Sequence, residues 1–205
     1  MNVQKELNLK MNKLTLIAFT LISFQFAGCA LTTDKINIAY QPRANISVVD
    51  GAEKINVKVV HEDKRTVYKD RVGVKKNGYG MEMAAIVPTT DISKTFADAV
   101  ASEIESLGFK LGEGGKTIKV ELVRFYNDFK MGFFAGDSVA DGLINVSVSN
   151  QSGELVFSRS YEGGGIEKNI QLATGENARL ALTKAMTDIV TKVPQDKDLQ
   201  SALLK

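Results

Sequence analysis

The sequence predicts an α+β domain in which an antiparallel-rich β-sheet carries two helices packed on one face. Three observations predict this fold class. Several segments alternate apolar and polar residues with the period of a half-buried strand, two longer segments repeat apolar residues every three or four positions, and polar or glycine-containing turns separate them. With 44% hydrophobic and 24% charged residues, the composition is that of a globular domain, which we place at residues 44–205.

Three strands are expected before the first helix. Residues 55–59 alternate apolar and polar side chains, and the charged stretch 61–66 marks the exposed end of that strand. Residues 71–76 and 81–87 flank a Gly-Tyr-Gly sequence that suits a bend between two extended segments. Pro88 is expected to end the pairing, because proline has no N–H to donate to a neighbouring strand.

The first helix is expected to begin after Thr90 or Asp91, whose side-chain oxygens can accept hydrogen bonds from the free N–H groups of the first turn. Gly108 is expected to end it, because glycine readily adopts the left-handed conformation found after a helix. Between these residues, one apolar stripe at spacings of four, four and three faces the core: Phe96, Val100, Ile104 and Leu107.

A further strand and a β-hairpin follow the first helix. The strand is expected at 118–122, and the hairpin is formed by 144–149 and 155–157 with a turn at 150–153. Three consecutive glycines at 163–165 are expected to end or bend the returning strand, because glycine weakens a strand interior.

A second amphipathic helix is expected near the C-terminus. It follows Thr174 and stops at Pro194, because proline lacks the N–H that continues a helix. Its apolar stripe also repeats at spacings of three and four: Ala178, Leu182, Ala185, Ile189 and Val193. Two such stripes are expected to cover the buried face of the sheet.

The N-terminal segment has the three-part layout of a secretory signal. Lysines precede an apolar run at 14–26, which ends in the small residues Ala27 and Gly28. The run is shorter than the roughly 20 apolar residues of a membrane-spanning helix. We therefore predict that residues 1–28 are a signal peptide that is removed, with Met11 as an alternative start to Met1.

The sequence Phe26-Ala27-Gly28-Cys29 resembles the bacterial lipobox, although Phe26 stands where leucine is usual. In such a site the small residues admit the processing enzymes, and only a thiol can form the thioether to a diacylglyceryl group. Cys29, the single cysteine of the chain, is predicted to carry diacylglyceryl and N-acyl lipid, with 29–43 as a lipidated tether. The alternative is an ordinary signal peptide followed by an incidental cysteine.

Composition excludes several other classes of protein. One cysteine and one histidine can form neither an internal disulfide nor a Cys/His zinc site. We expect no metal and no cofactor besides the covalent lipid. Residues 29–205 carry 23 basic and 23 acidic side chains, so no positive field is expected to attract nucleic acid.

The order of these features resembles the YajG-like family of bacterial lipoproteins. The resemblance implies an outer-membrane lipoprotein, and Ala30 in place of aspartate after the cysteine agrees with outer-membrane sorting. It supplies no catalytic residues, because the family has no established activity. The matching segments are the lipobox cysteine, Asp63-Lys64-Arg65-Thr66, the Asp91 helix ending in Leu107-Gly108-Phe109, the strand 118–122, the hairpin through 153–161 and the C-terminal helix.

Four residues of the predicted domain are candidates for a partner surface. Asp63 and Arg65 share one face of an extended chain, so they either form an exposed ion pair or present charges to a partner. Phe133 and Phe134 belong to a cluster of aromatic residues whose C-terminal part is rich in glycine. They either pack under a loop or form an exposed apolar patch suited to a protein or lipid partner.

We expect a non-catalytic interaction module that is anchored to the outer membrane by its lipid, faces the periplasm and binds another envelope protein. Two alternatives stay open. One is an accessory lipoprotein that carries lipid or helps to assemble an envelope machine. The other is a cell-wall hydrolase that uses two carboxylates about 5–10 Å apart.

Overall fold

The structure, a computed structural model, describes residues 31–42 and 47–205. Residues 33–205 form one compact unit, and residues 1–32 are a separate one. The helices of the larger unit are α3 (Ile92–Ser106), α4 (Gly175–Lys192) and α5 (Lys197–Leu204), with a short 3-10 helix η1 (Ala52–Lys54). Its strands are β1 (Asp34–Ile36), β2 (Asn56–Asp63), β3 (Gly73–Lys76), β4 (Glu82–Pro88), β5 (Lys110–Leu111), β6 (Lys116–Met131), β7 (Gly136–Ser149) and β8 (Leu155–Ile170).

These strands form one mixed eight-stranded sheet, so the domain is α+β as predicted. The expected antiparallel character holds for β3–β4, β6–β7 and β7–β8. The other pairs, β1–β4, β2–β5, β2–β6 and β3–β6, are parallel, so the sheet is mixed. Alternation of apolar and polar residues indicates which face of a strand is buried. It does not indicate whether the neighbouring strand runs parallel or antiparallel.

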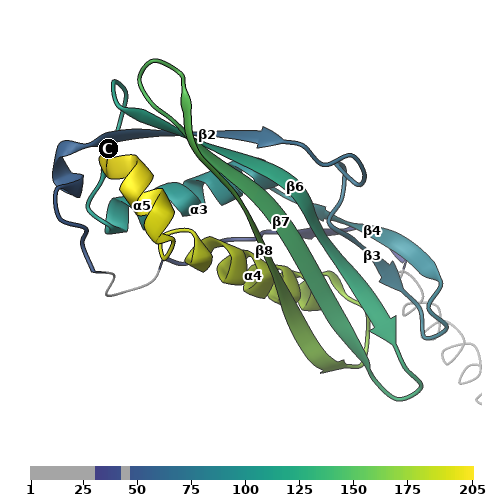
Figure 1. Cartoon of the computed structure of the whole chain (residues 1–205). Coiled ribbons are helices and arrows are strands. Elements are labelled where there is room, and N and C mark those ends of the chain that lie inside the picture. The colour runs from purple at the N-terminus through teal and green to yellow at the C-terminus, as the bar shows by residue number, and fades with distance from the viewer. Residues whose placement is uncertain (1–30, 43–46) are drawn as a thin grey trace, which may run out of the picture. The chain divides into compact units, whose positions relative to one another are not determined.

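Strands β6, β7 and β8 are much longer than the segments expected at 118–122, 144–149 and 155–157, and they form the large twisted ribbon in Figure 1. A register shift between Leu122 and Arg124 on β6 explains part of the difference. A bulge of this kind inserts an extra residue, so the buried face continues out of phase with the first half of the strand. After the shift, Phe125 and Phe129 are again buried.

The three glycines at 163–165 do not end β8, which continues to Ile170. A Cβ atom built on Gly165 would lie 2.1 Å from the carbonyl oxygen of Ala181, and one on Gly163 would lie 2.8 Å from Cγ1 of Ile189. Both neighbours belong to α4, which runs alongside β8 in Figure 1. These glycines therefore allow close packing of helix against strand instead of interrupting the strand.

The predicted helix boundaries are confirmed. Asp91 caps α3 by accepting a hydrogen bond from the N–H of Lys94, and Gly108 follows its end with a φ of +99°. Thr174 caps α4 in the same way through Asn177. The predicted apolar stripes of both helices are buried, and they belong to the core cluster that includes the buried side chains of β6 and β7.

The packing of α3 and α4 on one sheet face stays a prediction, which this shared core favours. The C-terminal helix α5 was not predicted. It has eight residues, too few for a clear apolar repeat. Its N-cap Asp196 accepts from the N–H groups of Asp198 and Leu199, and its buried residues are Leu199, Gln200 and Leu203.

The segment 29–43 was predicted as a tether, but part of it belongs to the folded domain. Asp34–Ile36 form β1, which pairs with β4, and Ile38 is buried. The hydroxyl group of Tyr40 donates a hydrogen bond to the carboxylate of Glu103 on α3. The polar sequence concealed this strand because it has only three residues, of which Ile36 alone is buried.

Candidate functional site

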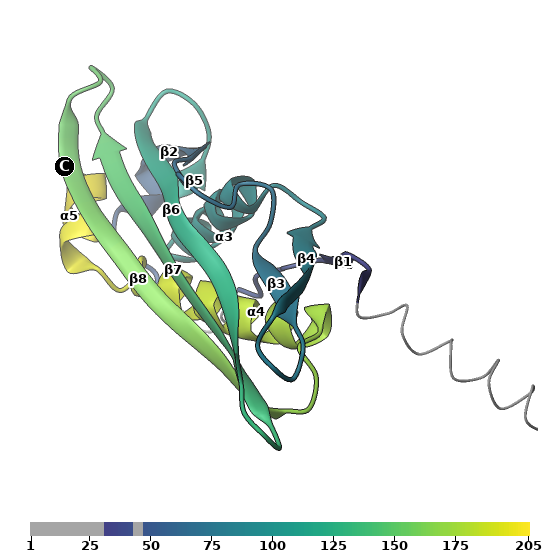
Figure 2. The same ribbon diagram turned by 90° about the vertical axis from the view of Figure 1, so that its right-hand side faces the viewer.

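Two ends of the sheet carry features that differ from the rest of the surface. One row of paired residues crosses the sheet and provides a reference level: Asp34, Ile86, Gly73, Asn127, Ala140 and Gly165. From this row, the chain of β3 leads to the β3–β4 turn and the chain of β6 leads to the β6–β7 turn. Because β3 and β6 are parallel, they leave the row in the same direction. Strands β4 and β7 return from these turns to the row. The β3–β4 turn and the β6–β7 turn therefore project from the same end of the sheet, as Figure 2 shows. The β8–α4 loop also begins there, because Ile170 pairs with Gly136.

We name this end the hairpin end and define it by its exposed apolar residues: Tyr79, Met81, Phe133, Phe134 and Leu172. Phe133 is 95% exposed and Phe134 is 85% exposed. Their rings contact each other edge to face with centroids 4.8 Å apart. The alternative that these two residues pack under a loop is therefore wrong, and the predicted exposed patch is present and larger than predicted.

The second pair of candidates, Asp63 and Arg65, has a structural role. They form the predicted ion pair, in which Arg65 Nη2 lies 2.8 Å from Asp63 Oδ2. The same guanidinium donates to the carbonyl oxygens of Tyr68 and Lys69, and Arg65 is only 5% exposed. Because its donors are directed into its own loop, Arg65 is not available as a charged contact for a partner.

The electrostatics of this pair agree with that role. Burial would raise the pKa of Asp63, but the hydrogen bonds from Arg65 outweigh it and hold the pKa below its ordinary value. The carboxylate thus stays ionised and holds the loop at neutral pH. Sequence spacing predicted the pairing but could not show that the loop carbonyls enclose the guanidinium.

His61, Ser93 and Asp91 lie next to one another in an arrangement that superficially resembles a catalytic triad. Nδ1 of His61 lies 2.9 Å from Oγ of Ser93, and this hydroxyl group donates to Oδ1 of Asp91 at 2.8 Å. The hydrogen bond from Ser93 lowers the pKa of Asp91. With its proton directed to the aspartate, the serine accepts from the histidine, which is the reverse of general-base activation. Ser93 is also 2% exposed, so the cluster caps α3 and lacks the access that a nucleophile needs.

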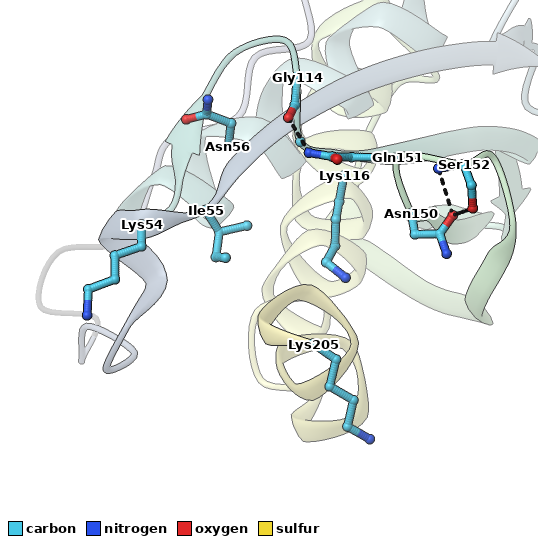
Figure 3. A pocket seen from close by; sticks show the side chains of 10 residues that line it. Lys54, Ile55, Asn56, Gly114, Lys116, Asn150, Gln151, Ser152 and Lys205 are labelled. Atoms are coloured by element: carbon cyan, nitrogen blue, oxygen red, sulfur yellow. Dashed lines mark hydrogen bonds between the residues drawn. The ribbon is translucent and has the colours of Figure 1, made fainter.

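The opposite end of the sheet carries a polar pocket of about 500 Å³. Lys54, Lys116 and Lys205 line it from three different segments, and Figure 3 shows that the side chains of Lys54 and Lys205 extend outward in different directions. We name it the lysine pocket. Its rim is ordered by hydrogen bonds between loops, because Gln151 Nε2 donates to the carbonyl oxygen of Gly114 at 2.6 Å. Such a site suits an anionic group on a partner.

The lysine pocket was not predicted from the sequence. Its residues come from the start of β2, the loop before β6, the turn after β7 and the end of α5, and no motif links them.

A buried cluster beside α5 stabilises the fold. The hydroxyl group of Tyr161 donates to Oδ2 of Asp196 at 2.7 Å, and burial raises the pKa of Tyr161 strongly. Within residues 31–42 and 47–205, no three His, Cys, Asp or Glu side chains converge as metal ligands.

The predicted lipidation site lies outside the described residues. Phe26, Ala27, Gly28 and Cys29 are part of the segment 1–30. Among the helices that the structure describes, none has the length and apolar character needed to cross a bilayer.

Comparisons with known proteins define the class of this chain. A crystal structure of a Xanthomonas campestris protein from the family DUF330 is 12% identical, and the alignment covers 77% of this chain and 91% of that one with a TM-score of 0.51. A minor lipoprotein from Acinetobacter baumannii is 6% identical over 71% of this chain and 92% of its own, with a TM-score of 0.43. The first of these shares the fold. No curated protein matches the sequence significantly.

Residues 42–204 match the family described as uncharacterized lipoprotein, Lipoprotein_16. The chain therefore belongs to this lipoprotein family, which is the YajG family that the sequence resemblance indicated.

Proposed function

We propose that this protein is an outer-membrane lipoprotein whose domain faces the periplasm and acts as a non-catalytic interaction module for another envelope component. The observation that carries the proposal is the short connection between the predicted anchor and the fold. Membership in a lipoprotein family supports acylation of Cys29, and β1 begins at Asp34. An acylated Cys29 thus holds the domain next to the membrane.

The lysine pocket is the partner surface in this proposal. It lies at the end of the sheet opposite to the turns that lead into β4 and β7, and β1 begins on the side of those turns. A domain anchored through β1 therefore presents the pocket away from the bilayer. Lys116 and Lys205, which make no side-chain ion pair with other described residues, offer charge to an anionic group.

Replacing Cys29 by serine tests the anchor. We expect the variant to lose all incorporation of labelled palmitate and to accumulate as the unprocessed precursor, because a hydroxyl group cannot form the thioether. The measurements are metabolic labelling and the mass of the protein in a membrane fraction. Cys29→Ala is the matched variant with the same expected outcome. Normal processing of either variant would contradict the lipobox assignment.

Photo-crosslinking in intact cells tests the interaction module. A photoreactive residue at position 152, on the rim of the lysine pocket, is expected to form a reproducible adduct with one envelope component. Lys116→Glu is expected to remove most of that adduct by repelling the anionic group, whereas Lys110→Glu changes the net charge equally but lies outside the pocket. Equal adduct formation in both variants, or no adduct in the parent, would refute the pocket as the partner surface.

The pockets of the domain favour the interaction module over a lipid carrier. The lysine pocket and a smaller pocket beside β5 are both open to solvent, and the residues lining the lysine pocket are mostly polar. A lipid carrier requires an apolar cavity instead.

A further inference from the structure

The direction of β1 determines which end of the domain is nearest to the predicted lipid. β1 and β4 are parallel, with Asp34 level with Ile86 and Ile36 level with Pro88. Because β4 runs away from the β3–β4 turn, β1 also runs away from it. Asp34 is thus the residue of β1 closest to the hairpin end, which is the end that carries the exposed Phe133 and Phe134.

Asp34 is held firmly at this position. Its Oδ1 accepts from Nζ of Lys75 at 2.9 Å, and its Oδ2 accepts from the backbone N–H of Gly175 at 2.7 Å. These contacts join β1 to β3 and to the N-terminus of α4. The chain therefore enters the fold at a fixed point, Asp34.

The length of that connection limits how far the domain can stand from the bilayer. Five Cα steps join Cys29 to Asp34, so they reach at most about 18 Å when fully extended. From the level of Asp34, the two hairpins continue for four residues toward their turns, from Ile86 to Glu82 and from Asn127 to Met131, which is about 13 Å. With the sheet directed at the bilayer, the turns thus reach approximately the depth of Cys29.

The chemistry of the hairpin end suits the interfacial layer of a bilayer. Tyrosine and phenylalanine rings gain free energy when they leave water for the headgroup and upper acyl region, where the tyrosine hydroxyl group can stay hydrated. Tyr79 is 91% exposed, and Met81 and Leu172 are 58% and 69% exposed. Lys130 and Lys168 lie near the ends of β6 and β8 that lead into the β6–β7 turn and the β8–α4 loop, and their long side chains can extend to lipid phosphates.

The geometry points to the hairpin end as a membrane-docking surface: Tyr79, Phe133 and Phe134 enter the interfacial layer of the leaflet that holds the acylated Cys29. The inference rests on the proposed lipid anchor and deepens it, because it gives the anchored domain a defined orientation. Acyl chains alone would leave the domain free to rotate. Docked hairpins direct the lysine pocket toward the periplasm.

Depth-dependent fluorescence quenching tests this orientation. The full-length lipoprotein, purified with its lipid, is reconstituted in vesicles of phosphatidylethanolamine and phosphatidylglycerol that contain lipids brominated near the headgroup. An environment-sensitive probe is attached to Phe134→Cys or to Ser152→Cys, since the acylated Cys29 has no free thiol. We expect the probe at position 134 to lose most of its fluorescence and to shift to the blue, and the probe at position 152 to be unchanged.

A second set of variants separates docking from any effect of the probe on its own site. With the probe on Met81→Cys, the double variant Phe133→Ser/Phe134→Ser is expected to lose most of the quenching. The matched control, Leu155→Ser/Val156→Ser, also removes two exposed apolar side chains but lies at the other end of the sheet. It should retain the quenching. All four residues are exposed, so thermal unfolding should be the same in both variants.

The outcomes distinguish this inference from the function on which it rests. Protein that floats with the vesicles while the probes at positions 134 and 152 remain equally unquenched would refute docking and leave the anchor intact. In that case, the exposed apolar residues of the hairpin end would be available to contact a protein partner. Protein that fails to float with the vesicles, although Cys29 is present, would overturn both the anchor and the docking.

Discussion

Leu182→Asp is expected to unfold the domain. Leu182 lies in the middle of α4 and is 0% exposed, so the substitution removes a large apolar side chain from the core and places a carboxyl group there. Loss of the leucine contacts alone costs about 2–5 kcal/mol, and burial of an unpaired polar or charged group adds to this cost. Together these effects approach the total free energy of unfolding of about 5–15 kcal/mol that is typical of a domain.

Thermal and urea unfolding followed by circular dichroism measure this effect. Leu172→Asp is the matched control, because it makes the same chemical change in the loop before α4 at a side chain that is 69% exposed. The control is expected to unfold at the same temperature as the parent. A cooperative transition of Leu182→Asp at the parent temperature would show that the apolar stripe of α4 does not face the core.

Gly165→Ala is expected to destabilise the domain by about 3 kcal/mol, the upper part of the range for overpacked sites. A Cβ atom at this position would lie 2.1 Å from the carbonyl oxygen of Ala181 and 2.6 Å from the backbone nitrogen of Ala185. Both atoms belong to the backbone of α4, so no side-chain rotation can relieve the contact. Either the helix moves away from β8 or the strand bends.

Gly164→Ala provides the control within the same run of glycines. Its Cβ atom would approach only the carbonyl oxygen of Ala140, at 3.2 Å. We expect a change in the free energy of unfolding below about 1 kcal/mol, because alanine also restricts the unfolded chain more than glycine does. Denaturant titration of both variants gives the comparison. Equal stability losses at positions 164 and 165 would argue against direct contact between Gly165 and α4.

The sequence predicted those parts of the fold in which local chemistry and burial agree. Asp91 and Thr174 were recognised as helix caps because a short oxygen-bearing side chain at that position satisfies backbone N–H groups whatever the rest of the fold does. The strand at 55–59 was recognised because one of its faces is buried and the other is solvated. The glycines at 163–165 were misinterpreted because their role depends on α4, which lies beyond them in the chain.

The candidate site was predictable only in part. Phe133 and Phe134 attracted attention because they stand among glycines, where a core is hard to build. Tyr79 and Leu172 gave no such signal, because single exposed apolar residues are common on protein surfaces. They gain significance only from the pairing of β3 with β6 and of β7 with β8, which places their loops at one end of the sheet.

By itself, the amino-acid sequence determined the α+β class, the limits of α3 and α4 and the chemistry predicted for Cys29, because each depends on neighbouring residues or on one side chain. Strand direction, the burial of Arg65 within its loop and the gathering of apolar turns at the end where β1 begins required the tertiary structure. These features arise from contacts between residues that are distant in the chain. Their energies depend on which surfaces contact each other in the fold. The alternation or spacing of residues within one segment does not specify those contacts.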